Sequence, residues 1–151
     1  SIALFEGNPG GKVTTGEVFS GKKVVLFGVP GAFTPGCHKT HLPGYLEDSA
    51  KFREKGVDDI VCVTVNDAFV AGAWAESLNA AGKVRVLADS NAELTKALGL
   101  ELDLTGPFGL GGLRTKRFSA VVVDGEIKVL NVEPDGGGLT CTLAPSLLSQ
   151  V

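Results

Sequence analysis

The sequence predicts an α/β domain in which helices cover both faces of a mixed central sheet. Three short apolar runs have the length and the β-branched content of buried strands, at residues 23–29, 60–65 and 84–88. Segments with helical spacing separate these runs, so the strands are joined by crossovers and run parallel. Two further β-rich runs flank Asp124-Gly125, a pair typical of tight hairpins, which adds antiparallel strands. The chain is expected to form one domain over residues 1–151.

The first crossover begins directly after the strand at 23–29. Pro30-Gly31 ends that strand, and apolar residues then recur at helical spacing through 37–55, which predicts a helix there. Pro43-Gly44 lies inside the helix and predicts a kink, because proline has no N–H to donate. Gly56 ends the helix, as glycine often does just after a last helical turn.

The rest of the chain continues this alternation and closes with the hairpin. Asp67 is a favourable cap for the next helix, and Gly82 follows its end. In order, the elements after Gly56 are a strand at 60–65, a helix at 68–81, a strand at 84–88, a helix at 89–98, a Gly-rich loop with little regular structure at 99–113, strands at 118–123 and 126–132, and a helix at 144–150. A βαβ unit followed by ββα is the order of the thioredoxin fold, so we predict a three-layer thioredoxin fold.

The composition argues against several classes of partner. The net charge of −3 does not favour nucleic acid or an anionic membrane surface. No stretch approaches the ~20 apolar residues of a membrane-spanning helix, and the N-terminus carries no signal-peptide pattern. With 44% hydrophobic residues, the chain can build its core without a metal ion or disulfides. We therefore expect no nucleic-acid partner, no membrane partner and no cofactor.

The cysteines and the chain ends bear on the compartment. Three cysteines are an odd and small number for a secreted disulfide scaffold, so an intracellular, reducing compartment is expected. Ser149-Gln150-Val151 is a weak variant of the peroxisomal Ser-Lys-Leu signal. The chain contains no Met and starts at Ser1, so we expect the translated protein to begin earlier, with a leader or a trimmed start. Cytoplasm, mitochondrion and peroxisome are not distinguished.

Cys37 is the candidate reactive residue because it lies where the first strand turns into the first helix. Backbone N–H groups are unpaired at a helix start and carry partial positive charge, which favours a thiolate over a thiol. Thr34 can turn its hydroxyl toward the sulfur. Pro35 forces a tight entry that leaves the amides of Gly36 and Cys37 open to a ligand. The competing interpretation is an inert, buried cysteine.

Six segments of the chain carry motifs of a known family. They are Pro30-Gly31-Ala32-Phe33-Thr34-Pro35-Gly36-Cys37, Thr40-His41-Leu42-Pro43-Gly44, Val65-Asn66-Asp67-Ala68-Phe69-Val70, Lys116-Arg117-Phe118-Ser119, Asn131-Val132-Glu133-Pro134-Asp135-Gly136 and Gly138-Leu139-Thr140-Cys141. These segments resemble peroxiredoxins, and in particular their fifth, atypical two-cysteine class. The resemblance runs over nearly the whole chain, so it is more specific than one motif.

The resemblance implies a role for five residues. Cys37 matches the cysteine that attacks the peroxide, and Thr34 matches the hydroxyl that orients thiolate and peroxide. Arg117 matches the arginine that holds the thiolate and the charge developing on oxygen, and Pro30 matches the residue that shields the sulfur. Cys141 matches the resolving cysteine, which forms an intramolecular disulfide with Cys37. A mobile loop is expected to bring Cys141 to Cys37, because Gly136-Gly137-Gly138 precedes it.

The implied activity is a thiol peroxidase that uses thioredoxin as its reductant. Hydrogen peroxide, alkyl hydroperoxides and peroxynitrite are the candidate substrates, and antioxidant defence and redox homeostasis are the implied processes. The resemblance further implies a monomer or weak homodimer, and an edge strand from residues before Ser1. One alternative is a disulfide reductase, but Cys37 is not followed by the Cys-x-x-Cys spacing. Another is a redox-sensing or chaperone-like module without turnover.

Other polar and apolar residues near these motifs have weaker assignments. Cys62 lies within an apolar strand, and a buried residue with no part in catalysis is expected. His41 is expected to be a hydrogen-bond partner of the Cys37 site, and His38 is expected to be solvated. Cys37, His38 and His41 do not have the spacing of a zinc site and lack a fourth ligand, so no metal site is predicted. Phe33, Leu110 and Leu139 either form an apolar collar that favours organic hydroperoxides or are ordinary packing residues.

Overall fold

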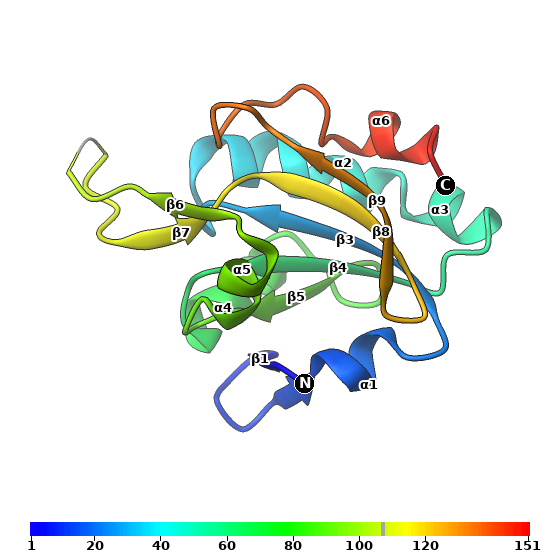
Figure 1. The fold of residues 1–151 in the computed structure, drawn as a ribbon, viewed down its shortest axis with the longest axis horizontal. Helices are drawn as coiled ribbons and strands as arrows, with labels where there is room; N and C mark the ends of the chain where they lie inside the picture. Colours follow the sequence, from blue (N-terminus) through cyan, green and yellow to red (C-terminus); the bar gives the residue numbers. More distant parts are fainter. Residues whose placement is uncertain (107) are drawn as a thin grey trace.

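The computed structural model describes residues 1–106 and 108–151, and it is built around a seven-stranded mixed sheet (Figure 1). The strand order across this sheet is β2-β1-β5-β4-β3-β8-β9. The strands are β1 (Ala3–Phe5), β2 (Lys12–Thr14), β3 (Lys23–Val29), β4 (Asp59–Thr64), β5 (Arg85–Ala88), β8 (Phe118–Val123) and β9 (Glu126–Val132). A separate two-stranded ribbon pairs β6 (Glu101–Asp103) with β7 (Leu113–Thr115).

The centre of the sheet follows the predicted βαβ and hairpin arrangement. Strands β3, β4 and β5 are parallel neighbours, while β8 runs antiparallel to β3 and β9 antiparallel to β8. Every residue of β3 from Val24 to Val29 is buried, because helices cover both faces of the sheet. The predicted mixed α/β thioredoxin fold is confirmed.

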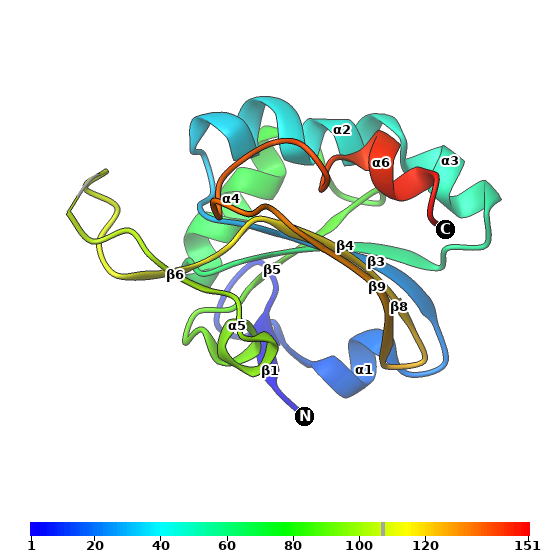
Figure 2. The same ribbon diagram turned by 45° about the horizontal axis from the view of Figure 1, so that its top comes forward.

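Helices form a layer on each side of the sheet (Figure 2). One face packs against the cluster that includes Phe27, Tyr45, Trp74 and Leu147, and the other against the cluster that includes Leu26. The first face carries η1 (Cys37–His41), α2 (Leu42–Glu47), α3 (Ser49–Glu54), α4 (Ala68–Ser77) and α6 (Ala144–Leu148), and the second carries α1 (Thr15–Phe19) and α5 (Glu93–Leu98). None of the helices within residues 1–106 and 108–151 is long and apolar enough to cross a membrane.

The helix predicted over 37–55 differs in its start and in the place of its irregularity. Helical backbone begins at Pro35, two residues early, and proline suits a first helical position. Residues 37–41 form a π turn, closed by Leu42 N–H donating to the Cys37 carbonyl, and a second break falls at Asp48. The irregularity therefore lies just before Pro43, whose missing N–H removes a helical hydrogen bond, rather than at Pro43-Gly44 itself.

Short elements occur in a segment predicted to be a loop and in the N-terminal residues, for which no element was predicted. Residues 3–19 form β1, β2 and α1, and β2 is one edge of the sheet. The stretch 99–113 contains β6 and the start of β7, which form the ribbon that projects from the body in Figure 1; residue 107 lies outside the described residues. Strands of three residues carry too little pattern to be recognised in a sequence.

The ends of the other helices shift by a few residues. Helix α4 ends at Ser77 rather than 81, and α6 ends at Leu148 rather than 150. Helix α5 starts at Glu93 rather than 89, because the buried Asp89 side chain accepts hydrogen bonds from the amides of Leu94 and Thr95 and caps that helix.

Candidate active site

Cys37 lies in the first turn of the helix that follows β3, and its side chain is fully buried. Strand β3 places the loop 30–36 at the end of the sheet, and the helix then turns back over the sheet. Backbone N–H groups of a first helical turn have no acceptor within the helix, so the N-terminal end of the helix, where Cys37 lies, carries partial positive charge. The position of Cys37 at a helix start agrees with the sequence prediction, although the turn is of the π type.

The Thr34 hydroxyl is the first polar group in contact with the sulfur. Thr34 Oγ1 lies 3.0 Å from Cys37 Sγ and 2.6 Å from the carbonyl oxygen of Gly31. The hydroxyl has a single proton, so it donates to one of these two acceptors at a time. It can donate to a sulfur anion, or accept from a thiol while it donates to Gly31. Thr34 is therefore able to serve both protonation states of Cys37.

Arg117, the residue just before β8, also contacts the sulfur. The antiparallel register pairs Phe118 with Gly28, near the end of β3. Arg117 Nη2 donates to Cys37 Sγ at 3.4 Å, and the arginine is only 4% exposed. Among the described residues, no carboxylate lies within 4.0 Å of its guanidinium. A buried cation without a carboxylate partner favours a negative charge on the sulfur beside it.

Two glycines allow this close approach. A Cβ atom on Gly36 would lie 3.1 Å from Arg117 Nη2, so a side chain there would press on the guanidinium. A Cβ atom on Gly28 would overlap the ring of Phe118 at 2.1 Å, so the β3–β8 pair that positions Arg117 requires glycine at this point.

His41 holds the other nitrogen of the arginine. Arg117 Nη1 lies 3.0 Å from His41 Nδ1; because the guanidinium only donates, Nδ1 accepts and the imidazole proton is on Nε2. His41 Nε2 then donates to the Thr142 carbonyl at 3.1 Å, and Tyr45 Oη donates to the same oxygen at 2.7 Å. Burial and the Arg117 charge lower the pKa of His41 from 6.5 to about 3, so the ring is neutral. The expected hydrogen-bonding role of His41 is observed.

Cys141 lies near the site but is not bonded to Cys37. It occupies the segment between β9 and α6, is partly buried, and has a free thiol, as do Cys37 and Cys62. Cys141 Sγ lies 3.6 Å from the Val132 carbonyl oxygen and 3.7 Å from Glu133 Oε2, and its single proton is donated to one of these acceptors at a time. The predicted disulfide between Cys37 and Cys141 is not formed in this structure.

Glu133 binds the segment that carries Cys141. Its two carboxylate oxygens accept from the amide and hydroxyl of Thr140 at 2.9 and 2.6 Å, and from the amide and hydroxyl of Thr142 at 3.1 and 2.7 Å. Burial raises the pKa of Glu133, but these hydrogen bonds outweigh it and lower the pKa from 4.5 to about 2. The carboxylate is therefore ionised at neutral pH although its side chain is only 1% exposed.

The other cysteine and the second histidine differ in how well they match expectation. Cys62 is fully buried in β4, as predicted, and burial raises the pKa of its thiol. His38 is half-buried rather than fully solvated: Trp74 Nε1 donates to His38 Nδ1 at 3.0 Å, and the imidazole stacks on Phe33 with centroids 5.8 Å apart. No group of three or more metal-ligating side chains occurs among residues 1–106 and 108–151.

The three residues of the expected collar lie in different surroundings. Leu139 Cδ1 lies 3.4 Å from the position of a Cβ on Gly36, which places it beside Arg117. Phe33 is 48% exposed and has a left-handed backbone with φ of 65°. Leu110 is half-buried, and its carbonyl accepts from Arg114 Nη2 at 2.8 Å.

Pro30 connects the projecting ribbon to this region. It is buried, and its carbonyl oxygen lies 3.4 Å from Arg114 Nη1. Arg114 therefore ties Leu110 of the ribbon to the loop that begins at Pro30.

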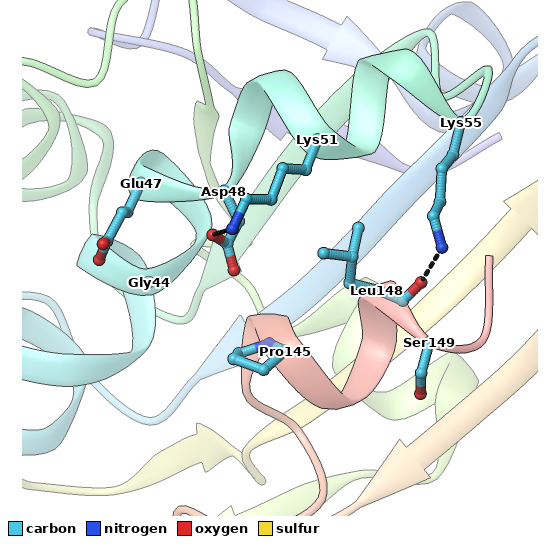
Figure 3. Close-up of a pocket in the computed structure, with 8 residues that line it drawn as sticks. All are labelled: Gly44, Glu47, Asp48, Lys51, Lys55, Pro145, Leu148 and Ser149. Atoms are coloured by element: carbon cyan, nitrogen blue, oxygen red, sulfur yellow. Dashed lines mark hydrogen bonds and ion pairs between the residues drawn. The ribbon is translucent and has the colours of Figure 1, made fainter.

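One groove of the molecule is lined by none of the residues that contact the Cys37 sulfur (Figure 3). It has a volume of about 490 Å³ and runs between α2–α3 and α6. Its side chains are mostly charged, and Lys51 pairs with Asp48 at 3.3 Å while Lys55 donates to the Leu148 carbonyl at 3.0 Å. No cysteine or histidine lines this groove.

Sequence reasoning did not assign a role to three residues of the network. These residues are Tyr45, Glu133 and Thr142, of which Glu133 lies within the matched segment 131–136. Tyr45 is buried against Phe27, with stacked rings 4.0 Å apart, and burial raises the pKa of its hydroxyl. An acidic residue directly after an apolar strand was the available signal for Glu133.

Comparison with known proteins gives consistent matches over most of the chain. A family model described as Redoxin matches residues 2–144. The chain is 51% identical to Peroxiredoxin-2E-2, chloroplastic, of Oryza sativa subsp. japonica, over 90% of this chain and 60% of that relative. It is 44% identical to Peroxiredoxin-2B of Arabidopsis thaliana, over 98% of this chain and 90% of that relative.

A solved structure shares the fold closely. Reduced Prx3 from Vibrio vulnificus, in complex with hydrogen peroxide, matches with a TM-score of 0.89 and 44% identity, over 99% of this chain and 92% of that one. The chain spans less than two thirds of the length of the chloroplastic relatives, 60% of the one from rice and 58% of one from Arabidopsis thaliana.

Proposed function

The chain belongs to the redoxin family and, within it, to the peroxiredoxins, and from this premise we propose that it is a thiol peroxidase. The observation that carries the proposal is the buried Cys37 sulfur between the Thr34 hydroxyl at 3.0 Å and the Arg117 guanidinium at 3.4 Å. Both groups stabilise negative charge where a peroxide would react. Hydrogen peroxide and alkyl hydroperoxides are the proposed substrates, and peroxynitrite is a third.

In the first step, the Cys37 thiolate attacks one oxygen of the peroxide. The new S–O bond forms as the O–O bond breaks, and the sulfur is oxidised to a sulfenic acid. The other oxygen leaves as water from hydrogen peroxide or as an alcohol from an alkyl hydroperoxide, in each case after taking up a proton, and as nitrite from peroxynitrite. Negative charge moves from sulfur to the leaving oxygen. Arg117 has several N–H donors in one plane, so it can donate hydrogen bonds both to the sulfur and to the leaving oxygen as the charge moves between them.

The second step forms a disulfide with Cys141. The Cys141 thiol gives up its proton and attacks the oxidised sulfur; an S–S bond forms, the S–O bond breaks, and water leaves. An external dithiol of the thioredoxin type then reduces the disulfide by exchange. Three cysteines, a small and odd number, fit a reducing, intracellular compartment, and the name of the rice relative places that protein in the chloroplast.

The proposal is tested by peroxide consumption coupled to thioredoxin, thioredoxin reductase and NADPH. Wild type is expected to turn over, Cys37→Ser is expected to lose activity, and Cys62→Ser, which changes the other buried thiol, is the matched control. Activity in Cys37→Ser equal to that of wild type would exclude Cys37 as the reacting group. A wild type that consumes one equivalent and then stops would indicate a redox-sensing module rather than an enzyme with turnover.

A further inference from the structure

We propose that Glu133 is a positioning residue that holds the Cys141 segment docked, and that release from Glu133 sets the rate of disulfide formation. This inference rests on the proposed function, in which Cys141 resolves the oxidised Cys37. It concerns a carboxylate that takes no part in the reaction of the peroxide.

The carboxylate is saturated with donors from a single short segment. Four hydrogen bonds from Thr140 and Thr142 reach its two oxygens at 2.6–3.1 Å, and Cys141 Sγ, between those two threonines, lies 3.7 Å from Oε2. The side chain is buried, and hydrogen bonds to a charged group are about twice as strong as neutral ones. Breaking this set exposes an ionised carboxylate, so the docked segment is held firmly.

Both ends of the segment are fixed, so only the part between them can move. Upstream, the segment follows β9, which pairs with β8 up to Val132. Downstream, Ala144 and Leu147 of α6 are buried in the core, and Lys55 binds the Leu148 carbonyl across the groove of Figure 3. Movement of Cys141 toward Cys37 is therefore a rearrangement of residues 133–143, and Glu133 is the first residue of this segment.

The Cys37 site also holds this segment, from the other side. Arg117 donates its backbone N–H to the Gly136 carbonyl at 2.8 Å and its Nε to the Gly137 carbonyl at 3.4 Å. His41, bonded to Arg117, donates to the Thr142 carbonyl. Hydrogen bonds thus connect the Cys37 sulfur to the segment through the arginine. Oxidation converts the negatively charged Cys37 sulfur to a neutral sulfenic acid, so Arg117 no longer faces a negative charge. The hydrogen bonds from Arg117 to the segment therefore weaken before those of Glu133.

The docked position protects Cys141 from premature reaction. Its S–H is turned toward the Val132 carbonyl and the Glu133 carboxylate, so the sulfur can attack Cys37 only after these contacts break. The reaction then joins the two sulfurs, breaks the S–O bond of the sulfenic acid, and releases its oxygen as water with the Cys141 proton. The oxidising equivalent comes from the peroxide already consumed.

Glu133→Gln tests the inference, because glutamine keeps the size but replaces one acceptor with an NH₂ group that faces donors. Stopped-flow fluorescence of Trp74, the one tryptophan of the chain, would follow the slow phase after peroxide addition. The rate of that phase does not depend on peroxide concentration, so it is not affected by changes in the rate of the first step. We expect disulfide formation to be faster by about tenfold, equal to ~1.4 kcal/mol of docking free energy, and sulfinic acid formation at high peroxide to fall.

Asp135→Asn is the matched control. Asp135 accepts from the amides of Gly137 and Gly138 on the exposed side of the same loop and has no bond to residues 139–142. It is expected to leave the rate of the slow phase near that of wild type.

Thr140→Val removes one hydroxyl and keeps the carboxylate. It is expected to accelerate the slow phase as Glu133→Gln does, but less. This variant keeps the test available if Glu133→Gln does not fold.

The outcomes separate the two proposals. If wild type forms the Cys37–Cys141 disulfide and neither Glu133→Gln nor Thr140→Val accelerates it, the positioning role is wrong and the proposed function stands. If disulfide formation slows, Glu133 presents Cys141 instead of restraining it, which also overturns the inference. If wild type forms no such disulfide, the two-cysteine mechanism itself fails.

Discussion

Replacing His41 with glutamine is expected to make the folded state less sensitive to mild acid. Burial and the charge of Arg117 lower the pKa of His41 from 6.5 to about 3. In the unfolded chain the imidazole titrates at its ordinary value, so between pH 6.5 and about 3 the unfolded state binds more protons than the folded state. The contribution of this histidine to stability is therefore complete above pH 6.5 and is lost as the pH falls.

The size of the effect follows from the two pKa values. At pH 5 the difference from 6.5 is 1.5 pH units, which at ~1.36 kcal/mol per unit lowers the free energy of unfolding by about 2 kcal/mol. Glu133, with its pKa lowered from 4.5 to about 2, adds its own loss only below pH 4.5. The range from pH 7 to pH 5 therefore reports mainly on the histidine.

Urea unfolding followed by Trp74 fluorescence at pH 7 and pH 5, at constant ionic strength, measures this effect. Glutamine can accept from Arg117 and donate to the Thr142 carbonyl, but it does not titrate. Wild type is expected to lose about 2 kcal/mol more than His41→Gln on going from pH 7 to pH 5. Equal losses in the two proteins would refute a neutral His41 held between Arg117 and Thr142.

Three further substitutions test the site and the sheet that positions it. Arg117→Gln is expected to slow the second-order reaction with peroxide by about 100-fold, as loss of a charge-stabilising donor does; stopped-flow rates like those of wild type would contradict its role. Thr34→Val is expected to slow the same reaction by about tenfold, with Thr34→Ser retaining most of it, since a hydrogen bond to a charged group contributes ~1.5–3 kcal/mol. Gly28→Ala is expected to lower the free energy of unfolding by about 1–3 kcal/mol through its clash with Phe118, whereas Gly137→Ala, which meets no neighbour within 4 Å, serves as the control in the same urea titration.

The parts of the fold that the sequence predicted are those with a strong local pattern. The buried strand at 23–29 and the hairpin around Asp124-Gly125 were recognisable because apolar periodicity and turn chemistry both lie within a few residues. Strands β1, β2 and β6 have three residues each, too few for a period to appear. The π turn before Pro43 depends on which helical bonds the proline removes, and sequence patterns indicated only that some irregularity would occur.

The candidate site shows the same division between local and tertiary information. Thr34 and Cys37 are three residues apart, so their contact could be expected from the chain itself. Arg117 lies 80 residues from Cys37, and only the resemblance to a family suggested that the two meet. Glu133 carries no such assignment, because its role depends on the loop that folds over it and not on its neighbours in sequence.

Mass spectrometry of the alkylated protein after one equivalent of peroxide tests the central claim most directly. The account predicts that Cys37 and Cys141 become inaccessible to the alkylating reagent, that Cys62 can still be alkylated once the chain is unfolded, and that digestion yields a peptide pair joined through Cys37 and Cys141 within one chain. A protein whose three cysteines all remain as free thiols after peroxide treatment would contradict the account.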